Sequence, residues 1–234
     1  MPSTPSLRHL QAVVLDFDGV IADTEPLHFE ACREILAPFG VALTAEEYAE
    51  HYIGVADRQA LVEAGRAHGF EVDGRTLDEL IARKAEVLRH VLADTRPMYP
   101  GVAQLLRTWS AAVPLAIASG ALRSEIELVL SVGGVAGAVR AVVSADDVRR
   151  SKPAPDPYLK ALDLLAPHVE GLEPGRTVAI EDSRWGIQSA REAGMRTVAV
   201  TTSFSREELA GADLIVDALP SLTLDVLDAL CAPS

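Results

Sequence analysis

Residues 12–27 of the 234-residue chain read AVVLDFDGVIADTEPL. The first four, Ala12 to Leu15, are all apolar, which is typical of a strand buried on both faces of a sheet. Asp16, Phe17 and Asp18 follow directly at the end of this strand. Because side chains alternate along a strand, we expect both carboxylates on one side and Phe17 on the other, in the core.

Two carboxylates this close repel each other and raise each other's pKa unless a cation or a shared proton intervenes. This cost suggests metal-assisted phosphoryl transfer with a carboxylate nucleophile. Asp16 would attack phosphorus and become an aspartyl-phosphate, while Asp18 would protonate the leaving oxygen and then activate water. Gly19 would let the chain turn away beside the ligand.

The D-x-D-G sequence at residues 16–19 has two other interpretations. An ordinary acidic turn fits these four residues equally well, because a short motif is only a hypothesis. A calcium loop of the EF-hand type is disfavoured, since its glycine stands at position six between two helices. Here the glycine is fourth and a strand precedes it.

The composition limits the classes of partner. A length of 234 residues with 49% hydrophobic residues allows one large domain, or one domain with a smaller insertion. A net charge of −13 argues against nucleic acid or an anionic membrane as a partner. No leader sequence or apolar run of ~20 residues is present, so we expect a cytoplasmic protein. Cys32 and Cys231 lie in no metal or redox motif and are expected to pack in the core.

The patterns along the chain change twice. Residues 26–95 show only helical patterns, with capping-box sequences at Thr44 and Thr76 and a candidate cap at Asp57. Outside this stretch, helices alternate with apolar strands at residues 12–15, 113–118, 141–144, 177–180, 197–200 and 214–216. Such alternation predicts parallel β-α units with right-handed crossovers, and hence an α/β fold with a doubly wound sheet.

Ligands bind outside the carboxyl ends of the strands in such a sheet. Four strand ends carry polar residues that suit one reaction: Asp16 and Asp18, Ser119-Gly120, Lys152, and Glu181-Asp182.

Each of these residues also has a structural interpretation. Ser119-Gly120 fits a plain turn, or a hydroxyl and a backbone N–H that hold a phosphoryl oxygen. Lys152 fits a solvated surface lysine, or an ammonium beside Asp16 that neutralises the transferring group. Glu181-Asp182 fits a helix N-cap, or carboxylate ligands for Mg²⁺ that Asp182 would share with Asp16.

Four segments follow one another along the chain: DFDGVIADT at 16–24, ASG at 118–120, SKPAPDPY at 151–158 and EDS at 181–183. In this order they resemble the haloacid dehalogenase superfamily of aspartate-nucleophile phosphatases, and within it the β-phosphoglucomutase-like branch. The resemblance spans Asp16 to about Gly194. It implies a Rossmann-like core at residues 1–25 and 97–234 with a helical cap domain inserted at residues 26–96.

The resemblance also assigns roles to the core residues. Asp16 is implied as nucleophile and metal ligand, and Asp18 as the acid/base whose main-chain carbonyl also binds the metal. Ser119 with Gly120 binds phosphate, and Lys152 steadies the anion. The implied cofactor is Mg²⁺, bound by the acidic residues Asp16, Asp18, Asp182 and, directly or through water, Glu181.

Three cap residues match places where this branch contacts the substrate or the leaving group: Thr24, His28 and Arg58. Each has an ordinary alternative. Thr24 can cap the following helix, His28 can be a polar residue with satisfied hydrogen bonds, and Arg58 can be exposed at a helix start.

We expect hydrolysis of a small phosphomonoester, such as a sugar or other metabolite phosphate, by a monomeric enzyme. A mutase is the first alternative. Mutases of this branch have a sequence similar to A-S-x-S-K-N where this chain has ASGALR at residues 118–123, and a lysine where it has Ile53. This chain therefore lacks two groups that hold a second phosphate in the mutases, although Arg123 could replace one of them. A dehalogenase is disfavoured, because the dehalogenases of this superfamily are expected to use a single aspartate without a metal, whereas this chain has both Asp18 and Asp182. A non-catalytic interaction module is the second alternative, although no core residue is missing.

Overall fold

The computed structural model describes residues 7–233 except 54, 56 and 96. Contacts divide the chain into two compact units, Met1–Asp23 with Pro97–Ser234, and Thr24–Arg96. The predicted division at 25/26 and 96/97 lies within two residues of these boundaries. The roles of the two units as catalytic core and cap stay predictions.

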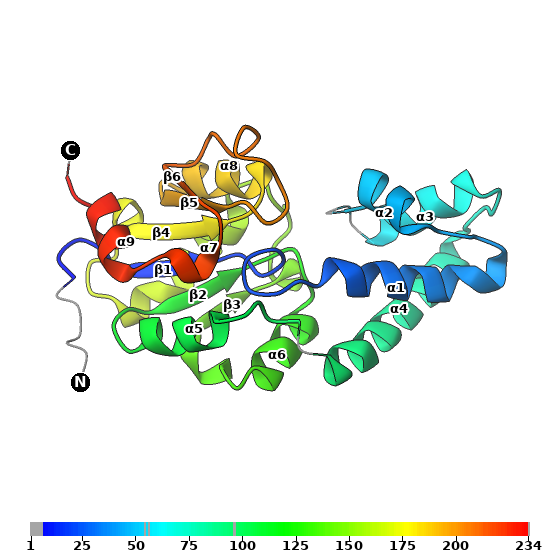
Figure 1. Ribbon diagram of the computed structural model, residues 1–234, viewed down its shortest axis with the longest axis horizontal. Helices are drawn as coiled ribbons and strands as arrows, with labels where there is room; N and C mark the ends of the chain where they lie inside the picture. The colour runs from blue at the N-terminus through cyan, green and yellow to red at the C-terminus, as the bar shows by residue number, and fades with distance from the viewer. Residues whose placement is uncertain (1–6, 54, 56, 96, 234) are drawn as a thin grey trace. The chain divides into compact units, whose positions relative to one another are not determined.

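The first unit is built on a six-stranded sheet in the order β3-β2-β1-β4-β5-β6, with every neighbouring pair parallel (Figure 1). This confirms the predicted doubly wound α/β fold. Leu15 is in register with Ile117 on one side and Ile180 on the other, so three strands end at one edge. The strands are β1 (Ala12–Leu15), β2 (Leu115–Ala118), β3 (Ala141–Val143), β4 (Thr177–Glu181), β5 (Arg196–Val200) and β6 (Leu214–Val216).

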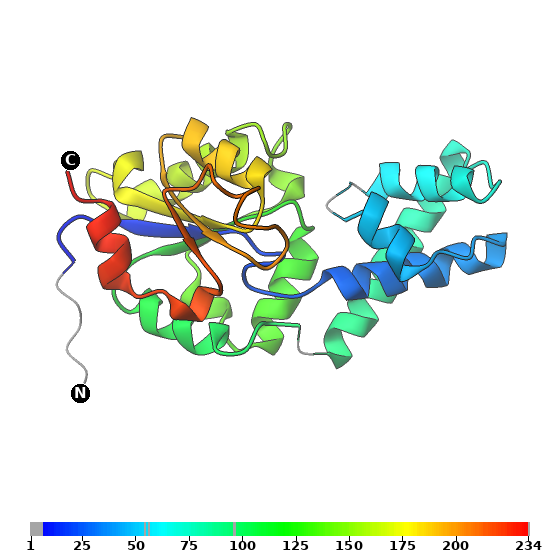
Figure 2. The same cartoon turned by 45° about the horizontal axis from the view of Figure 1, so that its top comes forward.

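Helices cover both faces of this sheet, as Figure 2 shows. They are α5 (Val102–Ser110), α6 (Arg123–Val132), α7 (Asp156–Leu165), α8 (Arg184–Glu192) and α9 (Leu224–Leu230), with short 3₁₀ turns η2 (Ala136–Ala138), η3 (Ala145–Asp147), η4 (Ala166–His168), η5 (Pro174–Arg176) and η6 (Leu219–Ser221). For α8 the sequence offered only the N-cap interpretation of Glu181-Asp182, and α9 was not predicted.

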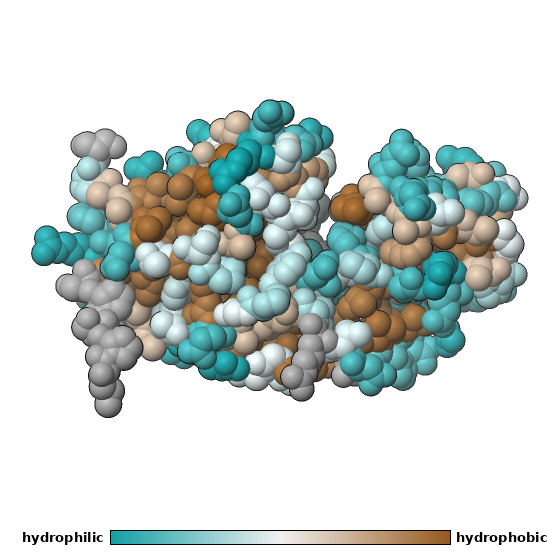
Figure 3. Space-filling model, viewed as in Figure 1, coloured by the Kyte–Doolittle hydropathy of each residue, from teal (hydrophilic) through white to brown (hydrophobic). Residues whose placement is uncertain are grey.

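Alternate residues of the central strands pack on opposite sides. Ala12 and Val14 of β1 join a cluster with Tyr158 and Leu162 of α7. Val13 and Leu15, which alternate with them along the strand, are also fully buried. This is the two-sided burial predicted for β1. At the sheet edge, apolar residues of β6 remain half-buried, and Figure 3 shows apolar atoms gathered near that edge.

The second unit contains α1 (Glu25–Leu36), η1 (Ala37–Phe39), α2 (Ala45–His51), α3 (Asp57–Ala67) and α4 (Gly74–Asp94). The described residues of this unit contain no strand, as predicted. Its core includes Leu36, Leu61 and Leu88. Over the described ranges of the whole chain, no helix combines the length and the apolar composition that crossing a membrane requires.

The structure corrects two of the predicted helix starts. Asp73, not Thr76, caps α4, because its carboxylate accepts a hydrogen bond from the Thr76 amide at 2.8 Å. Asp57 lies inside the first turn of α3, and its carboxylate pairs with Lys84 instead of capping the helix. The predicted cap at Thr44 is confirmed by a 3.1 Å hydrogen bond from the Glu47 amide.

Asp228 of α9 anchors the segment before β1. Its Oδ1 accepts hydrogen bonds from the backbone amides of Arg8, His9 and Leu10 at 3.0, 2.7 and 2.8 Å. Burial raises the pKa of Asp228, but the three amides more than offset this effect and hold the pKa below its usual value. The ionised carboxylate therefore stabilises the folded chain.

We expect Asp228→Asn to lower the free energy of unfolding by about 1–2 kcal/mol at pH 7, because it removes the charge that these amides bind. A carboxylate with a lowered folded pKa contributes its full stabilisation above its unfolded pKa. That contribution disappears as the pH falls through the folded pKa. Urea unfolding should thus separate D228N from the wild type at pH 7, and the difference should shrink as the pH falls through the folded pKa of Asp228. An equal effect of D163N, an exposed aspartate on α7, would contradict this explanation.

Candidate active site

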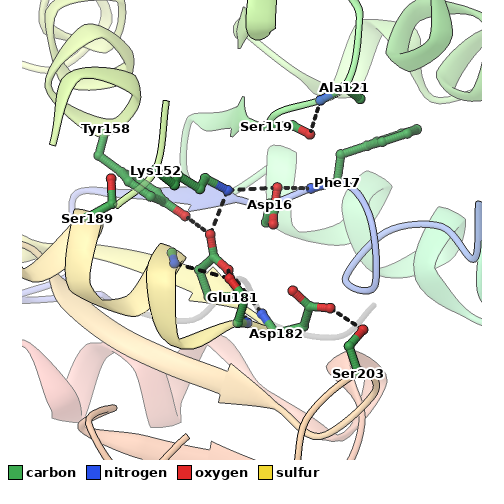
Figure 4. Close-up of polar contacts among 12 residues, drawn as sticks. Asp16, Phe17, Ser119, Ala121, Lys152, Tyr158, Glu181, Asp182, Ser189 and Ser203 are labelled. Carbon is green, nitrogen blue, oxygen red and sulfur yellow. Dashed lines mark hydrogen bonds and ion pairs between the residues drawn. The ribbon is translucent and has the colours of Figure 1, made fainter. Parts of the chain in front are cut away.

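The carboxyl ends of β1 and β4 bring three buried carboxylates together (Figure 4). One ligand oxygen from each of Asp16, Glu181 and Asp182 lies within 4.8 Å of the others. The parallel pairing of Leu15 with Ile180 produces this cluster, because the next residue on each strand is acidic. The predicted acidic residues of the two strand ends are therefore close in space.

Lys152 joins two of these carboxylates. Its Nζ lies 2.9 Å from Oδ1 of Asp16 and 2.6 Å from Oε1 of Glu181, and its side chain is 13% exposed. Burial lowers the pKa of Lys152, but the two carboxylates more than offset this and hold the pKa above its usual value. Lys152 is thus a largely buried ammonium that pairs with two carboxylates, and the alternative of a solvated surface lysine is wrong.

Both oxygens of Glu181 are already bound by protein donors. Oε1 accepts hydrogen bonds from Lys152 and from the Tyr158 hydroxyl at 2.7 Å. Oε2 accepts from the amides of Asp182 and Ser183 at 3.2 and 3.3 Å and from the Ser183 hydroxyl at 3.0 Å. Glu181 therefore holds Lys152 and the start of α8 in place.

The cluster carries more negative charge than Lys152 can balance. Burial, followed by the charge of Glu181, raises the pKa of Asp16 well above its usual value and that of Asp182 to about 7. The Asp18 carboxylate adds to both shifts, which places its charge near the same site. Clustered carboxylate oxygens are the ligands that Mg²⁺ prefers, so these residues fit a divalent cation.

The turn after β1 is tightly packed. The Phe17 amide donates to Oδ1 of Asp16 at 2.7 Å, and the Phe17 side chain is fully buried, as predicted. Gly19 has φ +72°, and a Cβ at this position would lie 1.9 Å from Oδ2 of Asp182. Both the backbone conformation and the lack of space therefore require glycine here.

Ser119 and Gly120 follow β2, the direct neighbour of β1. Ser119 is buried, and its hydroxyl accepts a hydrogen bond from the Ala121 amide at 3.0 Å. Gly120 is exposed, and an added Cβ would meet nothing within 4 Å. Crowding therefore does not explain the glycine, and the predicted phosphate contacts of both residues stay predictions.

The three predicted cap residues lie in the helical unit. Thr24 precedes α1, but its side chain makes no capping hydrogen bond. The interpretation that the Thr24 side chain caps this helix is therefore wrong. His28 Nδ1 lies 3.0 Å from Nζ of the buried Lys84. Arg58 is exposed and pairs with Asp78 of α4 at 2.7 Å. Their predicted contacts with the substrate stay predictions.

Four further polar residues were not predicted to have a role: Tyr158, Ser183, Ser203 and Lys84. Ser203 follows β5 at the same edge of the sheet, so extending the rule for strand ends to that strand would have found it. Tyr158 and Ser183 stand inside the quoted motifs without a role of their own. Lys84 lies in an amphipathic helix, where a lysine usually faces solvent, so no sequence signal marks its burial.

Comparisons with known proteins show the family and the fold of the chain. The family model described as haloacid dehalogenase-like hydrolase matches residues 13–200. The chain is 33% identical over 190 residues to fructose-1-phosphate phosphatase YqaB of Escherichia coli (strain K12), covering 80% of this chain and 95% of that protein. The crystal structure of CbbY from Rhodobacter sphaeroides in complex with phosphate superposes with a TM-score of 0.81 at 28% identity, covering 94% of this chain and 99% of CbbY. β-Phosphoglucomutase from Clostridium difficile shares the fold, with a TM-score of 0.79 at 21% identity and coverage of 95% and 97%.

Proposed function

Because the chain belongs to the haloacid dehalogenase-like hydrolase family, we propose that it is a Mg²⁺-dependent phosphatase that hydrolyses a small phosphomonoester through an aspartyl-phosphate on Asp16. The largely buried ammonium of Lys152 beside the Asp16 carboxylate carries this proposal. A sugar phosphate is the favoured substrate class, because the similar protein YqaB is named a fructose-1-phosphate phosphatase.

In this proposal, Asp16, Asp182 and the main-chain carbonyl of Asp18 hold Mg²⁺. Glu181 would bind the ion through a water molecule, because protein donors already bind both of its carboxylate oxygens. Bound Mg²⁺ supplies positive charge that neutralises the transferring phosphoryl group.

The proposed reaction has two steps. A carboxylate oxygen of Asp16 forms a bond to phosphorus as the bond to the leaving oxygen breaks, and Asp18 gives that oxygen its proton. Asp18 then removes a proton from water, which attacks phosphorus and releases phosphate from Asp16. The Phe17 amide and Lys152 hold the Asp16 carboxylate at Oδ1 throughout. Ser119 and Gly120 bind the phosphoryl oxygens.

The helical unit is proposed as a cap that excludes water and selects the substrate through Thr24, His28 and Arg58. The remaining expectations are a monomer in the cytoplasm that binds a small phosphorylated metabolite and neither nucleic acid nor membrane. The net charge of −13 supports the last two.

The first test measures phosphate release from a panel of sugar and other metabolite phosphates, with Mg²⁺ and with EDTA. We expect turnover only with Mg²⁺. Mg²⁺ should also raise the melting temperature of the wild type, because a ligand that binds the folded state stabilises it. In Asp182→Asn we expect a higher melting temperature without Mg²⁺, since one buried like charge is removed, and a lost response to Mg²⁺. Turnover in EDTA, or an unchanged Mg²⁺ response in D182N, contradicts the proposed metal site.

One observation supports the phosphatase over the mutase. Arg123, the residue that could hold a second phosphate, donates to Asp147 Oδ2 at 2.7 Å and to the Val142 carbonyl at 2.9 Å. These two contacts occupy Nη2, and Nη1 pairs with Glu127 at 3.5 Å, so the guanidinium is held by protein groups, which favours the phosphatase. The enzyme should be incubated with β-glucose 1-phosphate and a trace of the 1,6-bisphosphate. Glucose 6-phosphate appearing faster than inorganic phosphate would overturn this choice.

A further inference from the structure

The loop after β5 contacts the candidate active site through two consecutive side chains. The Ser203 hydroxyl donates a hydrogen bond to Oδ2 of Asp182 (Figure 4). The Thr202 hydroxyl donates to the Gly19 carbonyl at 2.6 Å. The loop therefore binds both the turn after β1 and the end of β4.

An aromatic contact fixes the same loop to α8. Phe204 meets Trp185 edge-to-face, with ring centroids 5.6 Å apart, and also packs against Ile187 and Leu209. Trp185 lies in the first turn of α8, three residues after Asp182. Thr202 and Phe204, which flank Ser203, are therefore both fixed by contacts. This limits the positions that the Ser203 hydroxyl can take.

Gly19 leaves the space in which this hydrogen bond forms. A Cβ at residue 19 would lie 1.9 Å from Oδ2 of Asp182 and 2.9 Å from the Ser203 oxygen. The Asp182 carboxylate therefore lies against the backbone of one turn while Ser203 binds one of its oxygens. In Figure 4 the other oxygen lies on the side of Asp16.

We propose that Ser203 is a positioning residue that orients the Asp182 carboxylate and thereby sets the affinity for Mg²⁺. The proposal rests on the proposed function, in which Asp182 binds the ion. Carboxylates that ligate metals are usually hydrogen-bonded by a second residue, and removing that residue typically weakens metal affinity 10–100-fold. Ser203 occupies this position for Asp182, while Glu181 has its own donors and needs none from the loop.

The test compares Ser203→Val with Ser203→Thr, which have the same shape and differ in the hydroxyl. Isothermal titration should give a Kd for Mg²⁺ that is about 10–100-fold higher in S203V than in the wild type and much closer to it in S203T. In kinetic assays, S203V should need correspondingly more Mg²⁺ for half-maximal rate, while kcat at saturating Mg²⁺ changes little. A merely structural role would lower kcat and leave the Mg²⁺ requirement unchanged.

Ser205→Ala is the matched control in the same loop. The Ser205 hydroxyl binds Glu208 at 2.8 Å, so its loss should leave the Kd for Mg²⁺ unchanged. An unchanged Kd in S203V, or equal weakening in S203V and S203T, overturns the role of the hydroxyl. D182N separates this failure from failure of the proposed function: if D182N still binds Mg²⁺ as the wild type does, the metal site itself is wrong. If D182N loses Mg²⁺ binding and S203V keeps it, only the role of Ser203 is wrong.

Discussion

Replacing Asp16 with asparagine is expected to lower kcat for phosphate release by a factor of about 10⁴ or more, as removal of a nucleophile commonly does. An amide oxygen is a poor nucleophile, and the aspartyl-phosphate can no longer form at this position. The measurement is steady-state phosphate release with the best substrate of the panel. Mass spectrometry of the quenched wild-type enzyme should show one added phosphoryl group on the peptide that contains residue 16, and D16N should show none.

Stability separates this chemical effect from unfolding. Burial and the neighbouring carboxylates raise the pKa of Asp16, so the ionised side chain opposes folding in the absence of a cation. D16N should therefore melt at the same temperature as the Mg²⁺-free wild type or higher. Asp23→Asn, at an exposed aspartate of the same segment, serves as the control and should retain its activity. More than a tenth of wild-type turnover in D16N would show that another residue accepts the phosphoryl group.

The strands, and the polar residues that follow them, could be predicted because buried parallel strands are short apolar runs that end abruptly. The run at residues 12–15 ends at Asp16, and the run at 177–180 continues into Glu181. Neighbouring parallel strands end at the same edge, so residues far apart in the sequence were expected to meet. The contact of Lys152 with Asp16 was predicted as well, whereas its contact with Glu181 was not, because the strand before Lys152, β3, neighbours neither β1 nor β4.

Other features depend on side-chain contacts that periodicity does not encode. Asp73 and Thr76 can both cap a helix start, and the choice is made by which oxygen reaches the free amide. Lys84 is 1% exposed because Asp57 and His28 supply its partners from other helices. The rule for strand ends would have identified Ser203 as a candidate, but its partner Asp182 depends on β5 lying next to β4 in the sheet. In each case a long-range partner determines the role of a common polar residue.

Replacing Lys152 with methionine should have the second-largest effect, because it acts on chemistry and on stability together. Methionine keeps an unbranched side chain but removes the ammonium between Asp16 and Glu181. Loss of one partner from a buried ion pair typically costs about 3–5 kcal/mol, since the remaining charge is uncompensated. Loss of a group that stabilises transition-state charge lowers kcat about 10²–10³-fold. Urea unfolding and phosphate release measure the two effects, and Lys160→Met on the exposed side of α7 is the control.

A double mutant shows whether the penalty in K152M comes from the unpaired carboxylates. If it does, adding D16N to K152M removes one of the uncompensated charges and restores part of the lost stability, so the two substitutions are not additive. Mg²⁺ should likewise stabilise K152M more than it stabilises the wild type, because the ion supplies charge that the missing ammonium no longer provides. Additive effects of the two substitutions on the free energy of unfolding would mean that Lys152 stabilises the fold without its pairing to Asp16. Its contact with Tyr158, whose ring centroid lies 5.3 Å from Nζ, would then be the source of the stabilisation. The electrostatic role of Lys152 beside Asp16 would then be wrong.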